Sequence, residues 1–189
     1  VMHHGKVATA HLAPRYGGPF RTLGDVLIPE DDVPPAFYVN PADYERWMYL
    51  KGAKRERRVC KSSGHPYTYS EGPMLFPDAL DAPSRTVLTG EGGSGASRTK
   101  HVVRAQDGRM RRLTPVELER LFGFPDDWTN AGMTDVQRAF CMGNALVVGL
   151  VQRIGQAMCA YDSRRQMIKL QEGSQRTFSG DTTDAADAA

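Results

Sequence analysis

Apolar residues recur with a helical period in two segments of the C-terminal half of the chain. In the first, residues 110–125 (MRRLTPVELERLFGFP), the spacing of Leu118, Leu121 and Phe122 places them on one face of a helix. Gly123 is a natural helix stop, and Pro125 cannot continue the helix. The pattern therefore predicts a short helix with one buried face.

The start of this helix is marked by several residues at once. Thr114 is placed as the N-cap, Glu117 completes a capping box with it, and Pro115 fits the first helical position. Leu113 and Leu118 stand at the two positions of a hydrophobic staple, which fixes the angle at which the chain enters the helix. Such a complete set of start and stop signals indicates that another part of the protein depends on where this helix lies.

A second helical segment follows. Thr134 and Gln137 form another capping box, and Gly143 and Asn144 interrupt the pattern before apolar residues resume at helical spacing in 146–154. These features predict two helices, with Asn144 as the N-cap of the second. The first amides of that second helix could bind a carboxylate or only the cap side chain.

The N-terminal part of the chain is rich in proline and aromatic residues. Asn40 is a plausible N-cap, Pro41 fits the next position, and an apolar stripe from Tyr44 onward predicts a helix over 40–58. Residues 51–61 hold six Lys or Arg and one Glu. The sequence leaves open whether this basic run is a solvated helix end or a phosphate-contacting surface.

Residues 62–105 show a β pattern instead. Segments 86–89 and 101–103 are β-prone, a Gly/Ser-rich loop lies between them, and Asp107-Gly108 marks a tight turn. Strands joined by one long polar loop and one hairpin are therefore expected. Basic residues surround the loop, so its backbone amides could approach phosphates or base edges; these residues are Arg85, Arg98 and Lys100.

Charge and composition narrow the function classes only slightly. The 24 Lys and Arg stand against 22 Asp and Glu, so the net charge of +2 gives no global nucleic-acid signal and any basic surface must be local. The cysteines are far apart in sequence, and no metal site is expected. No apolar run could span a bilayer and the start lacks the core of a signal peptide, which predicts a cytoplasmic protein.

The order of the motifs resembles a known family. RRLTPVELERLFGFPDDWT followed by QRAFCMGNALVVGLVQRIG is similar to the last two motif blocks of the cytosine-5 DNA methyltransferases, and LDAPSRTVLTGEGG is similar to the end of their target-recognition region in bacterial members. The resemblance implies an α/β fold: the C-terminal recognition portion, with short strands, long loops and few helices, of a class I S-adenosylmethionine-dependent methyltransferase. Its last helix would dock on a doubly wound sheet that lies outside this sequence.

The same resemblance divides the chain. Residues 1–109 would form the target-recognition region, 110–130 the motif helix that supports it, 131–162 the helices that return to the cofactor domain, and 163–189 a polar, disordered tail. The residues expected to build the supporting motif are Arg112, Leu113, Thr114, Pro115 and Glu117.

Site residues follow from the resemblance as well. The candidates for contact with double-stranded DNA are Arg85, Thr86, Arg98 and Lys100, with Gly92 and Gly93 for close backbone approach. Those for S-adenosylmethionine are Gly143 and Asn144. Ala145 stands where many members have Ser, so a hydroxyl contact to the cofactor is expected to be lost.

The catalytic motifs of the family are not found. None of the three cysteines follows a proline, as the family's nucleophile does, and Glu-Asn-Val and Phe-x-Gly-x-Gly are absent. We therefore expect the chain to be inactive by itself and to need a catalytic N-terminal part, or a large subunit, in a bacterial or phage restriction-modification system. The alternatives are a non-catalytic DNA-binding protein, a degenerate remnant, or an RNA target as in the tRNA-modifying branch of the family.

Overall fold

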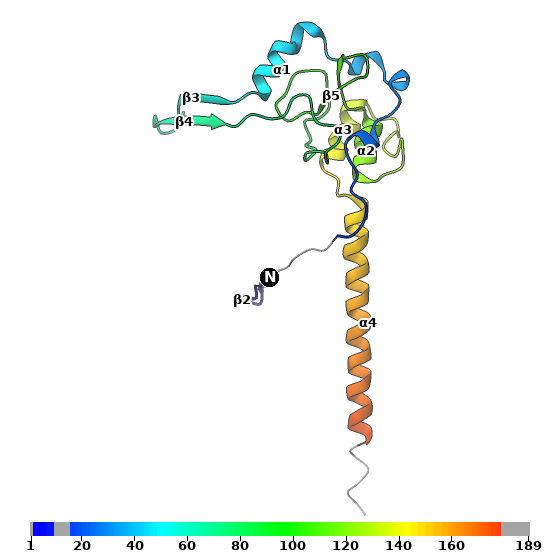
Figure 1. Cartoon of the computed structure of the whole chain (residues 1–189). Coiled ribbons are helices and arrows are strands. Elements are labelled where there is room, and N and C mark those ends of the chain that lie inside the picture. The colour runs from blue at the N-terminus through cyan, green and yellow to red at the C-terminus, as the bar shows by residue number, and fades with distance from the viewer. Residues whose placement is uncertain (1, 10–15, 179–189) are drawn as a thin grey trace, which may run out of the picture.

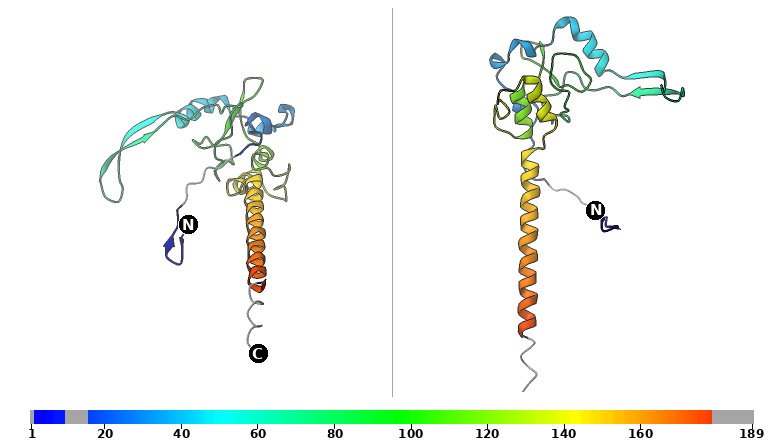
Figure 2. Two further views of the ribbon diagram at one scale, coloured as in Figure 1. Left: turned by 60° about the horizontal axis from the view of Figure 1, so that its bottom comes forward. Right: turned by 180° about the vertical axis from the view of Figure 1, so that it is seen from behind.

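Two long elements project from a body of short ones (Figure 1). The computed structural model describes residues 2–9 and 16–178. The ribbon of strands β3 (Lys54–Val59) and β4 (Pro66–Glu71) extends from one side of the body, and helix α4 (Val148–Phe178) extends from its base. Figure 2 shows the same two projections from other directions.

The remaining elements are short. Antiparallel strand pairs join β1 (Met2–His3) to β2 (Lys6–Val7), and β5 (Val102–Arg104) to β6 (Met110–Arg112). The helices of the body are α1 (Tyr44–Lys51), α2 (Pro115–Phe122) and α3 (Asp135–Gly143). Four 3-10 turns precede α1: η1 (Gly24–Val26), η2 (Glu30–Asp32), η3 (Pro35–Phe37) and η4 (Pro41–Asp43).

Strand β5 lies between two apolar clusters. Its residues Val102 and Val103 are adjacent in sequence, and both are fully buried. Because successive side chains of a strand point to opposite faces, each belongs to a different cluster. Val102 packs with Val39, Trp47 and Met110. Val103 packs with residues of η1, α2 and α3, among them both members of the predicted staple, Leu113 and Leu118. The hairpin thus joins the α1 side of the body to the α2–α3 side.

Both predicted capping boxes are confirmed. Thr114 Oγ1 accepts a hydrogen bond from the Glu117 amide at 3.3 Å, and Glu117 Oε2 accepts one from the Thr114 amide at 2.7 Å. Thr134 and Gln137 make the same reciprocal pair at the start of α3. Gly123 ends α2 with a φ of +79°, a left-handed conformation that favours glycine.

The helix predicted over 40–58 is wrong beyond Lys51. There α1 ends, the Gly52 amide donates to Met48 O at 2.8 Å, and the basic run becomes strand β3. The partner strand β4 comes from later in the chain and pairs with all of β3, from Lys54 with Glu71 to Val59 with Pro66. The two strands form a hairpin closed by residues 60–65, and the sequence pattern does not show it because the basic run has no alternation of apolar and polar residues.

The β pattern predicted after residue 62 is confirmed only in part. Segment 101–103 overlaps β5, and the turn at Asp107-Gly108 joins it to β6 as expected. Segment 86–89 forms no strand and belongs to a long irregular loop. Its backbone packs on α3, as described below, and this contact replaces a strand partner.

Asn144 is the C-cap of α3 and not the N-cap of α4. Its amide donates to Cys141 O at 3.1 Å and its Nδ2 to Phe140 O at 3.0 Å, while α4 begins only at Val148. The Ala145 amide, expected to be free, donates to Met142 O at 3.0 Å. The break in the apolar pattern therefore marks the last turn of one helix, whose carbonyls these groups satisfy.

Helix α4 continues to Phe178, where a polar tail was expected from residue 163. The stretch from 163 to 178 is rich in Arg, Gln, Met, Leu and Glu, which have high helix propensity, and this local preference outweighs its lack of apolar pattern. Residues 179–189 lie outside the described part of the chain. No helix among the described residues has the length and apolarity needed to cross a membrane.

Candidate nucleic-acid interface

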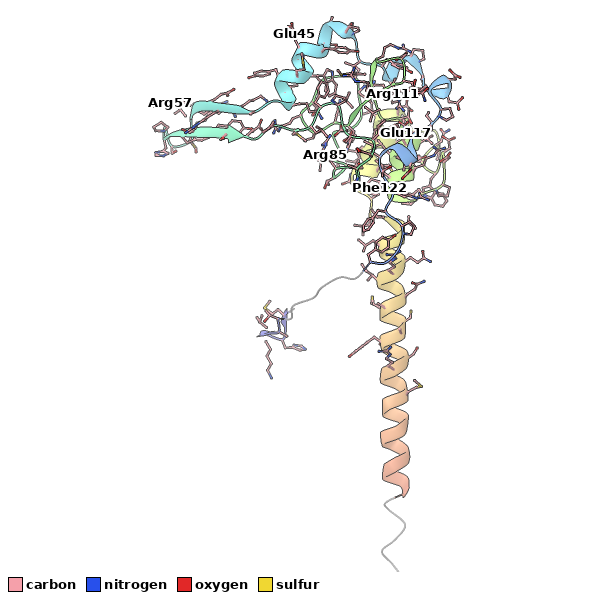
Figure 3. The ribbon with its side chains drawn as sticks, viewed as in Figure 1. Glu45, Arg57, Arg85, Arg111, Glu117 and Phe122 are labelled. Carbon is pink, nitrogen blue, oxygen red and sulfur yellow. The ribbon has the colours of Figure 1, made fainter. Side chains whose placement is uncertain are left out.

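A buried ion pair ties the start of α2 to β6. Arg111 Nη1 donates to Glu117 Oε2 at 2.9 Å and Nη2 to Oε1 at 2.7 Å, with side-chain exposures of 1% and 0%. The Glu117 carboxylate also accepts the amides of Thr114 and Ile28. It therefore joins the hairpin, the helix start and the N-terminal segment in one place (Figure 3). Arg111 is not among the residues expected to build the motif, although its spacing from Glu117 in RRLTPVE is visible in the sequence.

Arg112 has a different role, which is to hold the glycine-rich loop. Its Nη1 donates to Gly93 O at 2.8 Å, its Nη2 donates to Ala36 O, and its guanidinium lies 5.1 Å from the centroid of the Phe37 ring. Burial lowers the pKa of Arg112, and the charge of Asp135 offsets part of this effect. Strand β6 thus positions both the supporting helix, through Arg111, and the loop, through Arg112.

A second buried network joins α2 to α3. Arg138 Nη2 donates to Glu119 Oε1 at 2.9 Å, and Thr129 donates to the same carboxylate from its amide at 3.0 Å and from its hydroxyl. Burial alone would raise the pKa of Glu119, but these hydrogen bonds outweigh it and lower the pKa. The carboxylate is therefore charged at neutral pH and neutralises Arg138, which is 7% exposed. The sequence analysis missed this pair.

The segment leading into the loop is held by Asp78. Its Oδ1 accepts from Arg85 Nε at 2.6 Å, and its Oδ2 accepts from the Val102 amide at 2.8 Å. Burial tends to raise the pKa of Asp78, but the hydrogen bonds from Arg85 and Val102 lower it below its usual range. Arg85 also donates to Thr99 O and Lys100 O, both at 3.2 Å. Arg85 therefore bridges the beginning and the end of the loop.

The two ends of the loop are joined a second time through His101. Its Nδ1 lies 2.6 Å from Glu91 Oε1, its amide donates to Glu91 Oε2 at 3.0 Å, and its Nε2 lies 3.1 Å from Ser84 Oγ. His101 is fully buried and Glu91 is 6% exposed. This set of contacts closes the loop at its base and leaves residues 86, 88–90 and 94–95 exposed, while Val87 is buried in the core.

The other cations of the loop bind backbone carbonyls. Lys100 Nζ donates to Gly93 O at 2.9 Å and to Gly95 O at 2.8 Å. Arg98 Nη1 donates to Leu50 O at 3.0 Å and to Gly52 O at 3.2 Å, and it lies 3.2 Å from Glu71. An irregular loop leaves carbonyls without regular partners, and these multi-donor side chains satisfy them. The head groups of Arg85, Arg98 and Lys100 are thus engaged within the chain, and their contact with DNA stays a prediction.

Two of the chosen glycines allow the loop to pack closely on α3. A Cβ on Gly92 would lie 2.9 Å from Val136 Cα, and one on Gly143 would lie 2.3 Å from Thr89 N and 2.5 Å from Leu88 C. Gly93 instead has a φ of +78°, which favours glycine. The structure therefore packs the loop that carries the DNA candidates against α3, which carries the cofactor candidate Gly143.

Thr86 and Asn144 are the candidates with a side chain free to bind. Both are exposed. Thr86 makes no side-chain hydrogen bond within residues 2–9 and 16–178, and Asn144 uses only its Nδ2, toward Phe140 O. Each therefore keeps at least one polar atom for an outside ligand.

A buried lysine beneath the loop provides a test of this arrangement by pH. Lys51 is 1% exposed, its Nζ donates to Lys100 O, and burial together with the charge of Arg85 lowers its pKa from 10.5 to about 8. The unfolded chain keeps this proton up to higher pH than the folded one. The stability lost to the buried charge is therefore regained as the pH rises from about 8 to about 10.

We expect the difference in unfolding free energy between wild type and Lys51→Met to shift in favour of wild type by about 1 to 3 kcal/mol between pH 7.5 and pH 10. Urea unfolding of both proteins at the two pH values measures this shift. The other groups that titrate are the same in both proteins, so their contribution cancels in the difference. A difference that stays constant with pH would contradict a lysine buried as a cation.

The part of the chain that contains the two buried networks, the glycine-rich loop and the β3–β4 ribbon is similar to known proteins. A family model for C-5 cytosine-specific DNA methylase matches residues 28–160. Type II methyltransferase M.Sau3AI from Staphylococcus aureus is 43% identical over 163 residues, which make up 86% of this chain and 38% of that protein. The chain thus spans well under half of its relative's length. The resemblance found in the motif blocks is confirmed, and the chain belongs to the C-5 cytosine-specific DNA methylase family.

Proposed function

We propose that this chain is the C-terminal, target-recognition portion of a cytosine-5 DNA methyltransferase, which directs methyl transfer from S-adenosylmethionine to a cytosine in a specific DNA sequence. In this proposal residues 1–109 form the recognition region, 110–130 support it, and the helices from 131 onward return to a cofactor domain. The nucleophilic cysteine would come from a catalytic N-terminal part or a partner subunit.

One observation carries the proposal: the glycine-rich loop is fixed at its base and open at its surface. Arg85 and His101 hold its ends and Arg112 holds its middle at Gly93, while residues 86, 88–90 and 94–95 are exposed. A surface that reads DNA must be held to within a fraction of an ångström by the residues beneath it. Lys100 binds loop carbonyls without a salt-bridge partner in the described part of the chain, so its positive charge also makes the loop attractive to phosphates.

Helix α4 supports the proposal because it exposes an apolar face. Its residues at i, i+1, i+4, i+8 and i+11 lie on one side, and each is at least 46% exposed; they are Leu150, Val151, Ile154, Met158 and Tyr161. A continuous apolar stripe of this length is typical of a surface that another protein part covers. The occupant we propose is the catalytic part, since the matched segment makes up only 38% of the relative.

Asn144 fits the edge of a cofactor site. It is exposed, and its Oδ1 has no hydrogen-bond partner in the described part of the chain, so it can accept one from a ligand. Gly143 keeps it beside the loop by allowing contact with Leu88 and Thr89. When bound, S-adenosylmethionine supplies the methyl group. We propose that this chain contributes Asn144 to one side of its site and that the catalytic part contributes the rest.

The proposal is tested by reconstitution. The chain is mixed with M.Sau3AI from which the corresponding segment has been removed, and incorporation of radiolabelled methyl groups into duplex DNA is measured. We expect incorporation only when both parts are present. No incorporation by the mixed proteins would contradict the proposed function.

The α4 stripe is tested in the same assay. The double variant Leu150→Lys/Ile154→Lys is expected to reduce incorporation about tenfold or more, because two apolar side chains that docking would bury become charged. Gln152→Lys/Gln156→Lys adds the same charge on the opposite face of α4 and should leave incorporation unchanged. The isolated wild-type chain is expected to self-associate through the stripe, and the first variant to be monomeric. Equal activity of the two double variants would contradict docking through the stripe.

A further inference from the structure

The β3–β4 ribbon has two unequal faces. Successive side chains of a strand point to opposite sides, so β3 places alternate residues on each face. One face carries Lys54, Glu56 and Arg58, and the other carries Arg55, Arg57 and Val59. The ribbon extends from the body in every view, so both faces are accessible away from the core (Figures 1 and 2).

The first face is paired within the chain. Arg58 Nη2 lies 2.9 Å from Glu56, and its guanidinium carbon lies 3.6 Å from the centroid of the Tyr69 ring. Lys54 lies 3.4 Å from Glu71. These contacts join the two strands on one side, and they leave little of the basic charge of this face available to a partner.

The second face carries two unpaired guanidinium groups. Arg55 and Arg57 are both exposed, and neither guanidinium makes a hydrogen bond, an ion pair or a ring contact with any residue that the structure describes. Their cross-strand neighbours are the small polar residues Ser70 and Thr68. Figure 3 shows Arg57 on the part of the ribbon that lies away from the body. Two guanidinium groups, each able to donate two parallel hydrogen bonds, are thus free on one face of the two-stranded ribbon.

We propose that the face of Arg55 and Arg57 enters the major groove of DNA and that these two arginines contact base edges. The proposal rests on the proposed function as a recognition portion and assigns the reading of sequence to this ribbon. The major groove is about 12 Å wide and admits a two-stranded ribbon. A guanidinium can donate two parallel hydrogen bonds to guanine O6 and N7.

The spacing of the two arginines suits this role. Residues i and i+2 of a strand lie about 7 Å apart, which is about twice the rise per base pair, so Arg55 and Arg57 reach different base pairs. The paired face keeps the ribbon stiff because Arg58 stacks on Tyr69 and Lys54 bridges to Glu71. A stiff support reduces the entropy lost when the arginines bind.

The test uses the full chain at low concentration. A preferred duplex is first selected from a randomised DNA pool, and binding to it and to a scrambled duplex is then measured by fluorescence anisotropy at several salt concentrations. For wild type we expect a clear preference for the selected duplex. Arg57→Gln should reduce that preference about 5- to 150-fold, the range expected for loss of one bidentate base contact.

Two further variants identify the cause. Arg57→Lys keeps the charge but loses the forked geometry, so it should also lose the preference. Arg46→Gln removes an equally exposed and unpaired arginine from α1 and should keep it. Arg55 and Arg57 are solvent-exposed, so their substitution should not disturb folding.

The outcomes separate the two proposals. Preference retained in Arg55→Gln and Arg57→Gln, or equal weakening of both duplexes with a salt slope reduced by about one, would overturn base reading by the ribbon; the latter indicates phosphate contact. In both cases the wild-type chain would still prefer the selected duplex, so the proposed function would not be contradicted. A wild-type chain with no preference for any duplex would overturn the proposed function and this inference with it.

Discussion

Replacing Glu117 with alanine is expected to lower the free energy of unfolding by about 3 to 5 kcal/mol, because it leaves Arg111 charged, buried and without its partner. The change also removes the side-chain acceptor for the amides of Thr114 and Ile28. A small domain has a total stability of about 5 to 15 kcal/mol, so a large fraction of it would be lost. Urea unfolding followed by the fluorescence of the buried Trp47 measures the change.

Two controls show whether the ion pair is the cause. Glu45→Ala removes an exposed carboxylate of α1, far from the pair in Figure 3, and should change stability by no more than about 0.5 kcal/mol. Arg111→Met/Glu117→Leu removes both charges and should recover part of the loss. If Glu117→Ala is as stable as Glu45→Ala, the carboxylate does not hold the hairpin, the helix and the N-terminal segment together.

Gly143→Ala is expected to have the next largest effect, since the added Cβ would lie 2.3 Å from the Thr89 backbone nitrogen. Backbone cannot move aside as a flexible side chain can, so either α3 or the loop must shift. We expect a loss of about 1 to 3 kcal/mol in stability, typical of overpacking, together with weaker DNA binding. Urea unfolding and duplex titration measure the two effects.

Gly155→Ala is the matched control for this substitution. Gly155 lies within α4, and a Cβ there would meet no atom within 4 Å. Alanine at that position should stabilise the helix by up to about 1 kcal/mol. Opposite signs for the two glycines would assign the effect at Gly143 to the loop contact. A Gly143→Ala protein with wild-type stability and DNA affinity would contradict close packing of the loop on α3.

The local features of the fold could be predicted from the sequence. The capping boxes of Thr114 and Thr134 and the stop at Gly123 each depend on residues within one or two helical turns. A local pattern of this kind determines the backbone whatever lies further away. The short helix that follows Thr114 and ends at Gly123 could therefore be predicted from the sequence.

The ribbon could not be placed in the same way. The sequence KRERRV is charged at every position but the last, so it lacks the apolar–polar alternation of a strand, and the preceding apolar stripe favoured a helix. Pairing with β4 makes it a strand. Cross-strand contacts such as Lys54 with Glu71 and Arg58 with Tyr69 stabilise the hairpin, and a run of charged residues does not reveal them. Pairing with β4 leaves one face of β3 with internally paired charges and the other with the free side chains of Arg55 and Arg57.

The candidate site was predicted by position more than by role. Arg85, Arg98 and Lys100 do surround the loop, yet each directs its head group at backbone carbonyls, in the case of Arg98 those of Leu50 and Gly52. Composition shows that cations are near a loop, whereas burial and acceptor geometry decide whether they face inward. For the same reason the free arginines of β3 were not among the candidates.

Exchange of this segment between two cytosine-5 methyltransferases that modify different DNA sequences would show whether it selects the sequence. The chain replaces the corresponding segment of each enzyme, and methylated cytosines in the host genome are mapped by bisulfite sequencing. We expect both hybrids to methylate one common sequence that differs from those of the parent enzymes. Hybrids that each keep the sequence of their parent would contradict a recognition role for this chain.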